Sequence, residues 1–301
     1  MMKCKLFMLI LLSLTVSEKY VWAQQGILTA SIPQKVTNGF EFTEGPYWHP
    51  DGYLLFSDIP DNTIYRWKPG SMEADIFIKP SGHSNGITTD NKGRLVLAQH
   101  DGMISIIGEE QRMEILADEF EGKRLNSPND LAISSRGIIY FTDPPFGVNA
   151  EERKLSFSGV YMLKKGERPQ LMVDEFDLPN GIVLNEDESQ IYVNNTATGQ
   201  IMCFEIAEDG SLQNPTAFAN VGAADESGGA DGMAMDQEGR LYSTGPGGIY
   251  IFSPEGNQIE KIGMPTRTTN LTWGGPENKT LYITTPSAIY QLKMKVEGVS
   301  K

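Results

Sequence analysis

The sequence has 301 residues, with 25 Lys and Arg against 39 Asp and Glu, and its formal charge is −14. An acidic balance argues against nucleic-acid binding, which needs a basic surface. The content of 40% hydrophobic and 21% charged residues is typical of a folded globular chain. Two cysteines exclude a disulfide-rich scaffold and a cysteine-cluster zinc site.

Residues 1–23 have the pattern of a secretory signal peptide. Lys3 and Lys5 precede an apolar run over residues 6–16, and Ala23 ends the segment with a small side chain. The run is shorter than the roughly 20 residues that span a bilayer, and a buried N-terminal helix is the alternative. We therefore expect a periplasmic or secreted protein without a stable membrane span, with its mature domain over residues 24–301. Cys203 then remains as a lone, buried cysteine.

Six segments after residue 40 share one pattern of short strands and turns. Each begins with a polar residue, usually followed by Gly, and continues as a strand, a turn, a second strand and often a third. The six openings are Glu44-Gly45, Asn85-Gly86, Asn129-Asp130, Asn180-Gly181, Asp231-Gly232 and Asn270-Leu271. Second strands are expected over 53–56, 95–98, 138–142, 191–193, 241–243 and 281–284, and third strands over 63–67, 159–163, 200–205, 248–252 and 288–293.

The openings recur at intervals of 39 to 51 residues. Such a period, with three or four strands in each unit, is typical of propeller blades. The predicted fold is therefore all-β, a six-bladed β-propeller in one domain. Residues 24–42 are expected to supply an outer strand to the last blade and so close the ring. A β-sandwich is the alternative, but it does not explain a period that appears six times.

The opening residues predict a metal site in the central channel. The innermost strand of each propeller blade lines the channel, so equivalent positions converge in space. Five of these positions hold Glu44, Asn85, Asn129, Asn180 and Asp231, and the sixth holds Thr269 with Asn270 beside it. Calcium takes six to eight oxygen ligands, whereas zinc prefers His or Cys. The alternative is that Asn and Asp only tolerate a tight turn, but Glu44 has no turn preference.

The sequence resembles the senescence marker protein/gluconolactonase family, also called regucalcin-like, and within it the bacterial gluconolactonases. The resemblance covers about residues 40–293 and preserves the blade spacing. The matching motifs are Glu44-Gly45-Pro46, Ser81-Gly82-His83-Ser84-Asn85-Gly86, the run over residues 122–130, the run over residues 141–147, Pro179-Asn180-Gly181, Asp231-Gly232-Met233, Thr269-Asn270-Leu271, Gly274-Gly275 and Leu281-Tyr282.

The resemblance implies one catalytic divalent cation in the channel. By motif, its ligands match Glu44, Asn129, Asn180 and Asp231. The family typically uses calcium, and related members accept zinc, magnesium or manganese. Asn85 is then a substrate contact or a neighbour of the ligands rather than a ligand itself.

The implied activity is hydrolysis of a sugar lactone, such as glucono-1,5-lactone to gluconate. The metal polarises the carbonyl group, water attacks it, and Asp231 is the expected general base while also binding the metal. Glu44 is the alternative base. Other functions left open are hydrolysis of a related ester or organophosphate at the same site, and a non-catalytic propeller that binds a sugar or a protein.

Residues in blades 2 and 3 are candidates for substrate binding. Arg124 is interpreted either as a substrate contact or as a surface arginine, and His83 and His100 as possible substrate contacts. We expect Asp143 to cap its own turn rather than to line the pocket, and the charged segment 149–158 to be a solvated loop rather than a lid. Bacterial gluconolactonases usually have Asn at the position of His83, and Glu-His-Gly followed by two arginines where this chain has residues 99–103. The particular lactone is therefore left open.

Overall fold

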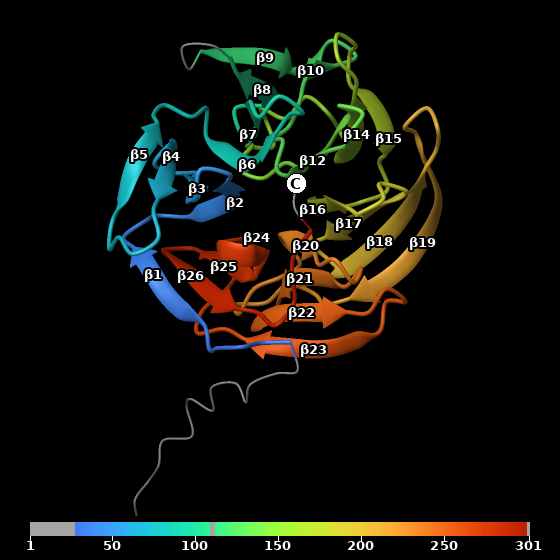
Figure 1. The fold of residues 1–301 in the computed structure, drawn as a ribbon. Coiled ribbons are helices and arrows are strands. Elements are labelled where there is room, and N and C mark those ends of the chain that lie inside the picture. The colour runs from blue at the N-terminus through green and yellow to red at the C-terminus, as the bar shows by residue number, and fades with distance from the viewer. Residues whose placement is uncertain (1–27, 109–111, 300–301) are drawn as a thin grey trace, which may run out of the picture.

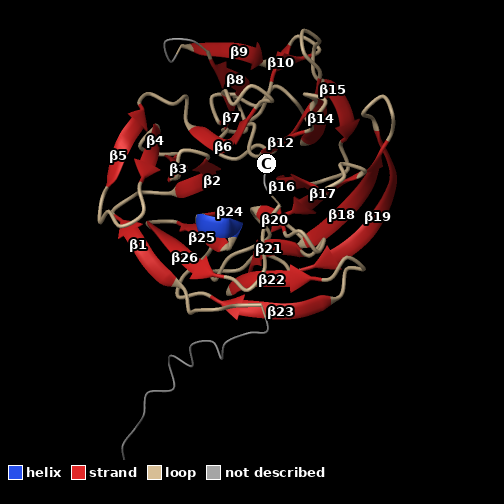
Figure 2. Ribbon diagram, in the orientation of Figure 1, coloured by secondary structure: helices blue, strands red, loops and turns tan. Residues whose placement is uncertain are grey.

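The computed structural model describes residues 28–108 and 112–299, and the predicted signal peptide over residues 1–23 lies outside this part. Six four-stranded antiparallel sheets are arranged as a ring around a central axis (Figure 1). The ring is built almost entirely of strands and turns, as Figure 2 shows. The predicted six-bladed propeller is confirmed.

Each blade is a meander whose first strand lies at the axis and whose last strand lies at the rim. Blade 1 consists of β2 (Thr43–His49), β3 (Tyr53–Asp58), β4 (Thr63–Trp67) and β5 (Ala74–Ile78). Blade 2 consists of β6 (Ser84–Thr89), β7 (Leu95–Gln99), β8 (Met103–Ile107) and β9 (Met113–Ala117). Blade 3 consists of β12 (Leu131–Ile133), β13 (Ile139–Asp143), β14 (Gly159–Leu163) and β15 (Gln170–Val173). A small hairpin of β10 (Glu119–Phe120) and β11 (Lys123–Arg124) precedes this blade.

The second half of the ring repeats the same order. Blade 4 consists of β16 (Pro179–Leu184), β17 (Gln190–Asn195), β18 (Gln200–Ile206) and β19 (Leu212–Asn220). Blade 5 consists of β20 (Met233–Met235), β21 (Leu241–Gly245), β22 (Gly248–Phe252) and β23 (Gln258–Gly263). Blade 6 contains β24 (Leu271–Gly274), β25 (Thr280–Thr285) and β26 (Ala288–Lys293), with the short 3-10 helix η2 (Pro276–Asn278) between the first two.

The N-terminal segment closes the ring. Strand β1 (Gln34–Asn38) pairs antiparallel with β26 and forms the outermost strand of blade 6, as expected for residues 24–42. Packing reinforces this closure, because the rings of Trp48 in blade 1 and Tyr282 in blade 6 are stacked with their centroids 5.0 Å apart. A sheet order of this kind joins the first and last strands of the described chain and excludes the alternative of a β-sandwich.

The strands that the repeat pattern did not predict lie mostly at the rim. The sequence interpretation omitted β8 and the outer strands β5, β9, β15, β19 and β23. In β19 most side chains are exposed, so the strand lacks the clear alternation of apolar and polar residues that marks a half-buried strand. The inner strands, by contrast, pack on both faces and were recognisable.

The core lies between neighbouring blades. Leu55 of blade 1 packs with Leu97 of blade 2, and Val96 of blade 2 packs with Phe141 of blade 3, each pair within one apolar cluster. Cys203 is a free and buried cysteine in β18, as expected. Within residues 28–108 and 112–299, no helix has the length and apolar character needed to cross a membrane.

Candidate functional site

The residues that open the six inner strands form a hydrogen-bonded ring around the axis. At every junction between neighbouring blades, a hydrogen bond connects an opening residue to the neighbouring blade. The bonds are Ser57 Oγ to Asn85 O (2.9 Å), Gly86 N to Asn129 O (2.8 Å), Thr142 Oγ1 to Asn180 O (2.7 Å), Asn194 Nδ2 to Asp231 O (2.6 Å), Gly232 N to Thr269 O (2.8 Å) and Thr269 Oγ1 to Thr43 O (2.7 Å). All four residues interpreted as metal ligands, and Asn85, are buried members of this ring.

Glycine follows the opening residue in four blades because the next blade comes very close at that point. A Cβ atom at Gly45 would lie 1.8 Å from the carbonyl oxygen of Asn85. One at Gly181 would lie 2.1 Å from the carbonyl oxygen of Asp231, and one at Gly232 would lie 1.8 Å from Asn270 Oδ1. The recurring glycine is therefore a requirement of blade-to-blade contact around the axis.

We expect Gly181→Ala to lower the free energy of unfolding by about 1–3 kcal/mol, the usual cost of overpacking. The new methyl group would meet backbone of the next blade, which cannot yield without moving Asp231. The matched control is Gly263→Ala at the end of β23, where a Cβ atom meets nothing within 4 Å. Equal melting temperatures for the two variants would contradict this account.

Two buried carboxyl groups lie on the ring and interact with each other. Glu44 Oε2 accepts hydrogen bonds from the backbone N–H of Gly45 (2.9 Å) and from Asn270 Nδ2 (3.0 Å). Burial raises the pKa of Glu44 to about 7, although both hydrogen bonds work in the opposite direction. Burial, followed by the negative charge of Glu44, also raises the pKa of Asp231 well above its ordinary value. Two such groups in one low-dielectric space strongly favour a positive charge between them.

Amide side chains complete the set of oxygen atoms beside these carboxyl groups. Asn180 donates from Nδ2 to Thr196 Oγ1 (3.0 Å), whereas its buried Oδ1 has no hydrogen-bond partner in the structure. The same amide lies against Asp231, whose pKa it lowers slightly against the effect of burial. The side chain of Asn129 is also buried on the ring. An unpartnered buried carbonyl oxygen is an expensive feature unless a ligand completes it.

The donor chemistry fits a hard divalent cation. Among the residues that the structure describes, no cluster of three or more His, Cys, Asp and Glu side chains could hold a metal. Glu44 and Asp231 supply two carboxylates, and Asn129 and Asn180 supply neutral amide oxygens, which is the ligand chemistry that calcium takes. The evidence for a cation site is the buried pair of carboxylates together with Asn180 Oδ1, which has no hydrogen-bond partner.

The sixth position of the ring is occupied differently. Thr269 donates to the carbonyl oxygen of Thr43 and lies 2.8 Å from the Thr284 hydroxyl oxygen, so its hydroxyl group is used within the fold. Asn270 instead reaches the site and holds Glu44 through its side-chain amide. The strict repeat register therefore points to Thr269, but the neighbouring residue makes the contact with the carboxylate.

His100 reaches the ring through Asn85. Asn85 Nδ2 lies 3.2 Å from His100 Nε2, so the amide donates this bond and the neutral imidazole accepts it. Burial, and to a lesser extent His83, lowers the pKa of His100 to about 4, so the ring is neutral at ordinary pH. The Oδ1 atom of Asn85 is buried and has no partner. His100 thus orients an amide whose oxygen is left for a ligand.

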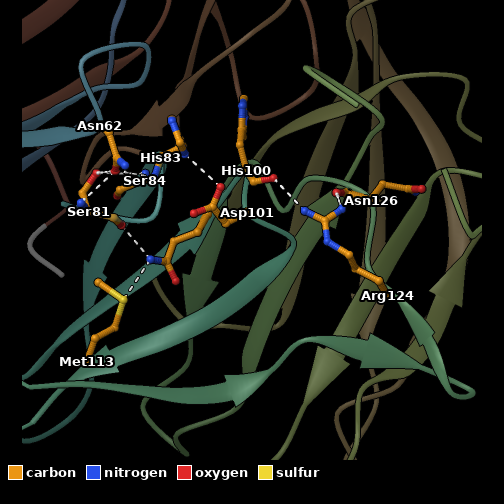
Figure 3. Close-up of polar contacts among 10 residues, drawn as sticks. Asn62, Ser81, His83, Ser84, His100, Asp101, Met113, Arg124 and Asn126 are labelled. Carbon is orange, nitrogen blue, oxygen red and sulfur yellow. Dashed lines mark hydrogen bonds and ion pairs between the residues drawn. The ribbon is translucent and has the colours of Figure 1, made fainter. Parts of the chain in front are cut away.

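His83 and Asp101 form a second, more exposed pair, next to the start of the strand that holds Asn85. His83 Nδ1 lies 2.8 Å from Asp101 Oδ1, and both side chains are partly open to solvent. The backbone of His83 has a left-handed conformation, with φ of 49°. Asn62 Oδ1 holds the loop in place by accepting the N–H groups of Ser81 and His83, each at 2.8 Å (Figure 3).

Arg124 is directed mainly to backbone carbonyl groups. Its guanidinium donates to Leu125 O (3.2 Å), Asn126 O (3.1 Å) and His100 O (3.4 Å), as Figure 3 shows for the last two residues. The structure thus gives Arg124 a role in fixing the loop that leads to Asn129. Contact with a substrate remains a prediction for this residue.

The expectation for Asp143 was wrong. Its carboxylate does not cap its own turn but accepts the backbone N–H groups of Asn126 (2.9 Å) and Ser127 (2.7 Å). Asp143 is fully buried, and desolvation raises its pKa to about 7. The residue therefore anchors the loop before Asn129 from the neighbouring strand β13.

The charged segment 149–158 is the second part of the connection from β13 to β14 and has no regular secondary structure. Glu151 and Glu152 are exposed, as expected of a solvated loop. The second half is anchored, because Leu155 is buried in the apolar cluster of blades 2 and 3, and the carbonyl oxygen of Phe157 accepts a bond from Asn126 Nδ2 (3.0 Å).

A cavity of about 350 Å³ lies within the channel, beyond the ring. All six inner strands contribute to its wall, which includes Asp130, Asn270 and Trp273. Val299, at the end of the described chain, also lines it. Glu44 and Asp231 do not line this cavity. The carboxylate pair therefore belongs to the polar ring rather than to the inner cavity.

Comparison with known proteins matches the chain to one family model. The model, described as the SMP-30/gluconolactonase/LRE-like region, matches residues 42–287. The chain is 32% identical over 303 residues to a gluconolactonase of Zymomonas mobilis, with 90% of this chain and 84% of that protein covered.

Solved structures show the same architecture. A gluconolactonase from Xanthomonas campestris superposes with a TM-score of 0.79 at 28% identity, covering 90% of this chain and 91% of the other. A calcium-binding protein named regucalcin, from Agrobacterium tumefaciens, superposes with a TM-score of 0.71 at 18% identity, covering 87% of this chain and 92% of the other.

Proposed function

Because this chain belongs to the SMP-30/gluconolactonase/LRE-like family and is a lactone hydrolase of the gluconolactonase type, we propose that it hydrolyses sugar lactones with the help of a divalent cation. Glucono-1,5-lactone is the proposed substrate and gluconate the product. The observation that carries this proposal is the meeting of two buried carboxylates and an unpartnered amide oxygen at the openings of the inner strands. Relatives that are lactonases favour catalysis over a purely binding role.

The proposed ligands of the cation are Glu44, Asn129, Asn180 and Asp231. When bound, the cation supplies Lewis-acid polarisation of the lactone carbonyl group. Calcium is the proposed ion, because only oxygen donors are available at this ring and a structural neighbour is described as calcium-binding. Zinc, magnesium and manganese are the alternatives to be tested.

The proposed role of Asp231 is that of general base. Its burial beside Glu44 makes the carboxylate a stronger proton acceptor than an exposed aspartate. In hydrolysis, the water oxygen bonds to the carbonyl carbon and the ring C–O bond breaks. The proton that Asp231 takes from the water passes to the departing ring oxygen, so the side chain is regenerated. Glu44, which Asn270 and Gly45 hold in place, suits the role of fixed ligand.

The residues around the ring suggest how a substrate is held. Asn85 offers its unpartnered Oδ1 to a hydroxyl group, and His100 fixes that amide. His83 directly precedes β6, the strand that holds Asn85, and pairs with Asp101, so it is the proposed contact at the outer side. Arg124 is exposed and lies beside His100, so it is a further candidate contact.

The test is an assay of acid release on a panel of sugar lactones, with EDTA and with added calcium. We expect EDTA to abolish turnover and calcium to restore it, because the cation is needed both to polarise the carbonyl group and to balance the carboxylate pair. Absence of cation-dependent hydrolysis of every lactone would refute the proposal. Turnover of aryl esters or organophosphates alone would favour the related hydrolase instead.

We also propose that the protein is exported to the periplasm or secreted. The proposal depends on the basic start, the apolar run and Ala23 in the first 23 residues. We expect the mature protein isolated from cells to begin at Gln24, as read by N-terminal sequencing. Recovery of the intact N-terminus from the folded protein would contradict it.

A further inference from the structure

An exposed arginine, Arg267, lies in the loop that leads from β23 to β24. The guanidinium carbon of Arg267 is 5.7 Å from the ring centroid of Phe42. Its Cγ lies against Gly228, where a Cβ atom would be 3.5 Å away. Phe42 precedes Glu44 by two residues, and Gly228 precedes Asp231 by three. Arg267 is therefore held between the two segments that lead to the carboxylate pair.

The hydrogen-bonding capacity of Arg267 is not used within the described chain. The side chain is exposed, and no carboxylate of residues 28–108 or 112–299 lies within ion-pair distance of it. Arg124, by contrast, donates to three backbone carbonyl groups.

We propose that Arg267 is a substrate-binding residue whose guanidinium donates hydrogen bonds to oxygen atoms of the bound lactone and to the carboxylate of the acid formed from it. This inference rests on the proposed lactone hydrolysis and names the side chain that positions substrate and product. The lactone is neutral and the opened acid is an anion. Hydrogen bonds from a guanidinium to a carboxylate are stronger than those to a hydroxyl group, so the residue affects product binding more than substrate binding.

The experiment compares Arg267→Met, Arg267→Lys and a matched control, Arg66→Met, in the calcium-loaded protein. Arg66 lies in β4 and makes the same kind of cation–π contact, 5.7 Å from the ring centroid of Tyr53, but it pairs with Asp75 and has no contact with the ring. Kinetics with glucono-1,5-lactone give kcat and KM, and product inhibition by gluconate gives an inhibition constant. Calorimetric titration with gluconate measures binding without turnover.

We expect Arg267→Met to raise the inhibition constant for gluconate about 10-fold and the KM about 3-fold, the range for loss of a charged and of a neutral hydrogen bond. The kcat should stay within about twofold, because the residue does not transfer the proton. Arg267→Lys should restore part of the gluconate affinity, and high salt should weaken gluconate binding in the wild type but not in Arg267→Met. Arg66→Met should change none of these constants.

Equal gluconate affinity in the wild type and Arg267→Met, at equal melting temperatures, would overturn the inference. Failure of the proposed function has a different signature, because the wild type would then hydrolyse no sugar lactone. In that event the gluconate titration alone decides, and loss of affinity in Arg267→Met but not in Arg66→Met still supports the assignment.

Discussion

Replacing Asp231 with Asn is expected to reduce kcat for lactone hydrolysis by about 10²–10⁴-fold, the usual contribution of a general base. The amide cannot accept a proton from water, whereas the buried carboxylate can, because its surroundings raise its pKa. The amide keeps one oxygen atom on the ring. Cation affinity should therefore weaken but stay measurable by calorimetry.

The comparison with Glu44→Gln separates the two roles of the carboxylate pair. Glu44 is held by Gly45 and Asn270, which suits a fixed ligand, so its replacement should lower cation affinity more than kcat at saturating calcium. Asp231→Asn should show the opposite ranking. Retained turnover in Asp231→Asn would remove Asp231 from the base role, and a large loss of kcat in cation-saturated Glu44→Gln would transfer that role to Glu44.

The cation-free protein is expected to lose stability through Glu44 as the pH rises from about 4.5 to about 7. Burial raises the pKa of Glu44 from 4.5 to about 7, so between these values the folded state binds a proton that the unfolded state has released. Stabilisation by that proton is complete below the lower value and is lost by the upper one, a change of roughly 3 kcal/mol for a shift of this size. Asp231 adds a change of the same sign.

The measurement is urea unfolding of the EDTA-treated protein at a series of pH values, compared with Glu44→Gln. The difference between the two proteins isolates the contribution of Glu44. Such a comparison is needed because His100, whose pKa is lowered to about 4, increases the stability of the folded protein as the pH rises. The Gln variant should therefore lose less stability over this range. Excess calcium should reduce the loss in the wild type, because the cation stabilises the ionised carboxylates of Glu44 and Asp231, whereas the loss that comes from the raised pKa of Asp143 should remain. Identical pH profiles for the two cation-free proteins would contradict the prediction.

The repeat in the sequence was enough to predict the fold and the convergence of the site. Spacing of 39 to 51 residues between polar openings indicated six blades, and six blades bring Glu44, Asn129, Asn180 and Asp231 to one axis. The outer strands were missed because solvent covers much of their surface, so their sequences carry little apolar alternation. The recurring glycine was visible, but its cause was not, since the atoms it approaches belong to the next blade.

The use of each polar side chain depends on neighbours that are distant in sequence. Asp143 was expected to cap its own turn, but it binds the backbone of residues 126 and 127, which the sheet register brings beside β13. His100 lies between β7 and β8, and its ring contacts the amide of Asn85, which belongs to β6. Arg267 lies in a loop outside the repeat, so no periodic signal marked it.

The sequence by itself determined the number of blades, the chemical type of the ring and the family resemblance, because these depend on spacing and residue type along the chain. Only the tertiary structure decided which oxygen atoms remain unpartnered and which charges face one another. Asn180 Oδ1 is left without a partner, and Glu44 raises the pKa of Asp231 across a distance of 187 residues in the chain. Desolvation and hydrogen-bond satisfaction are properties of the three-dimensional neighbourhood, and here every such neighbourhood is built from two or more blades.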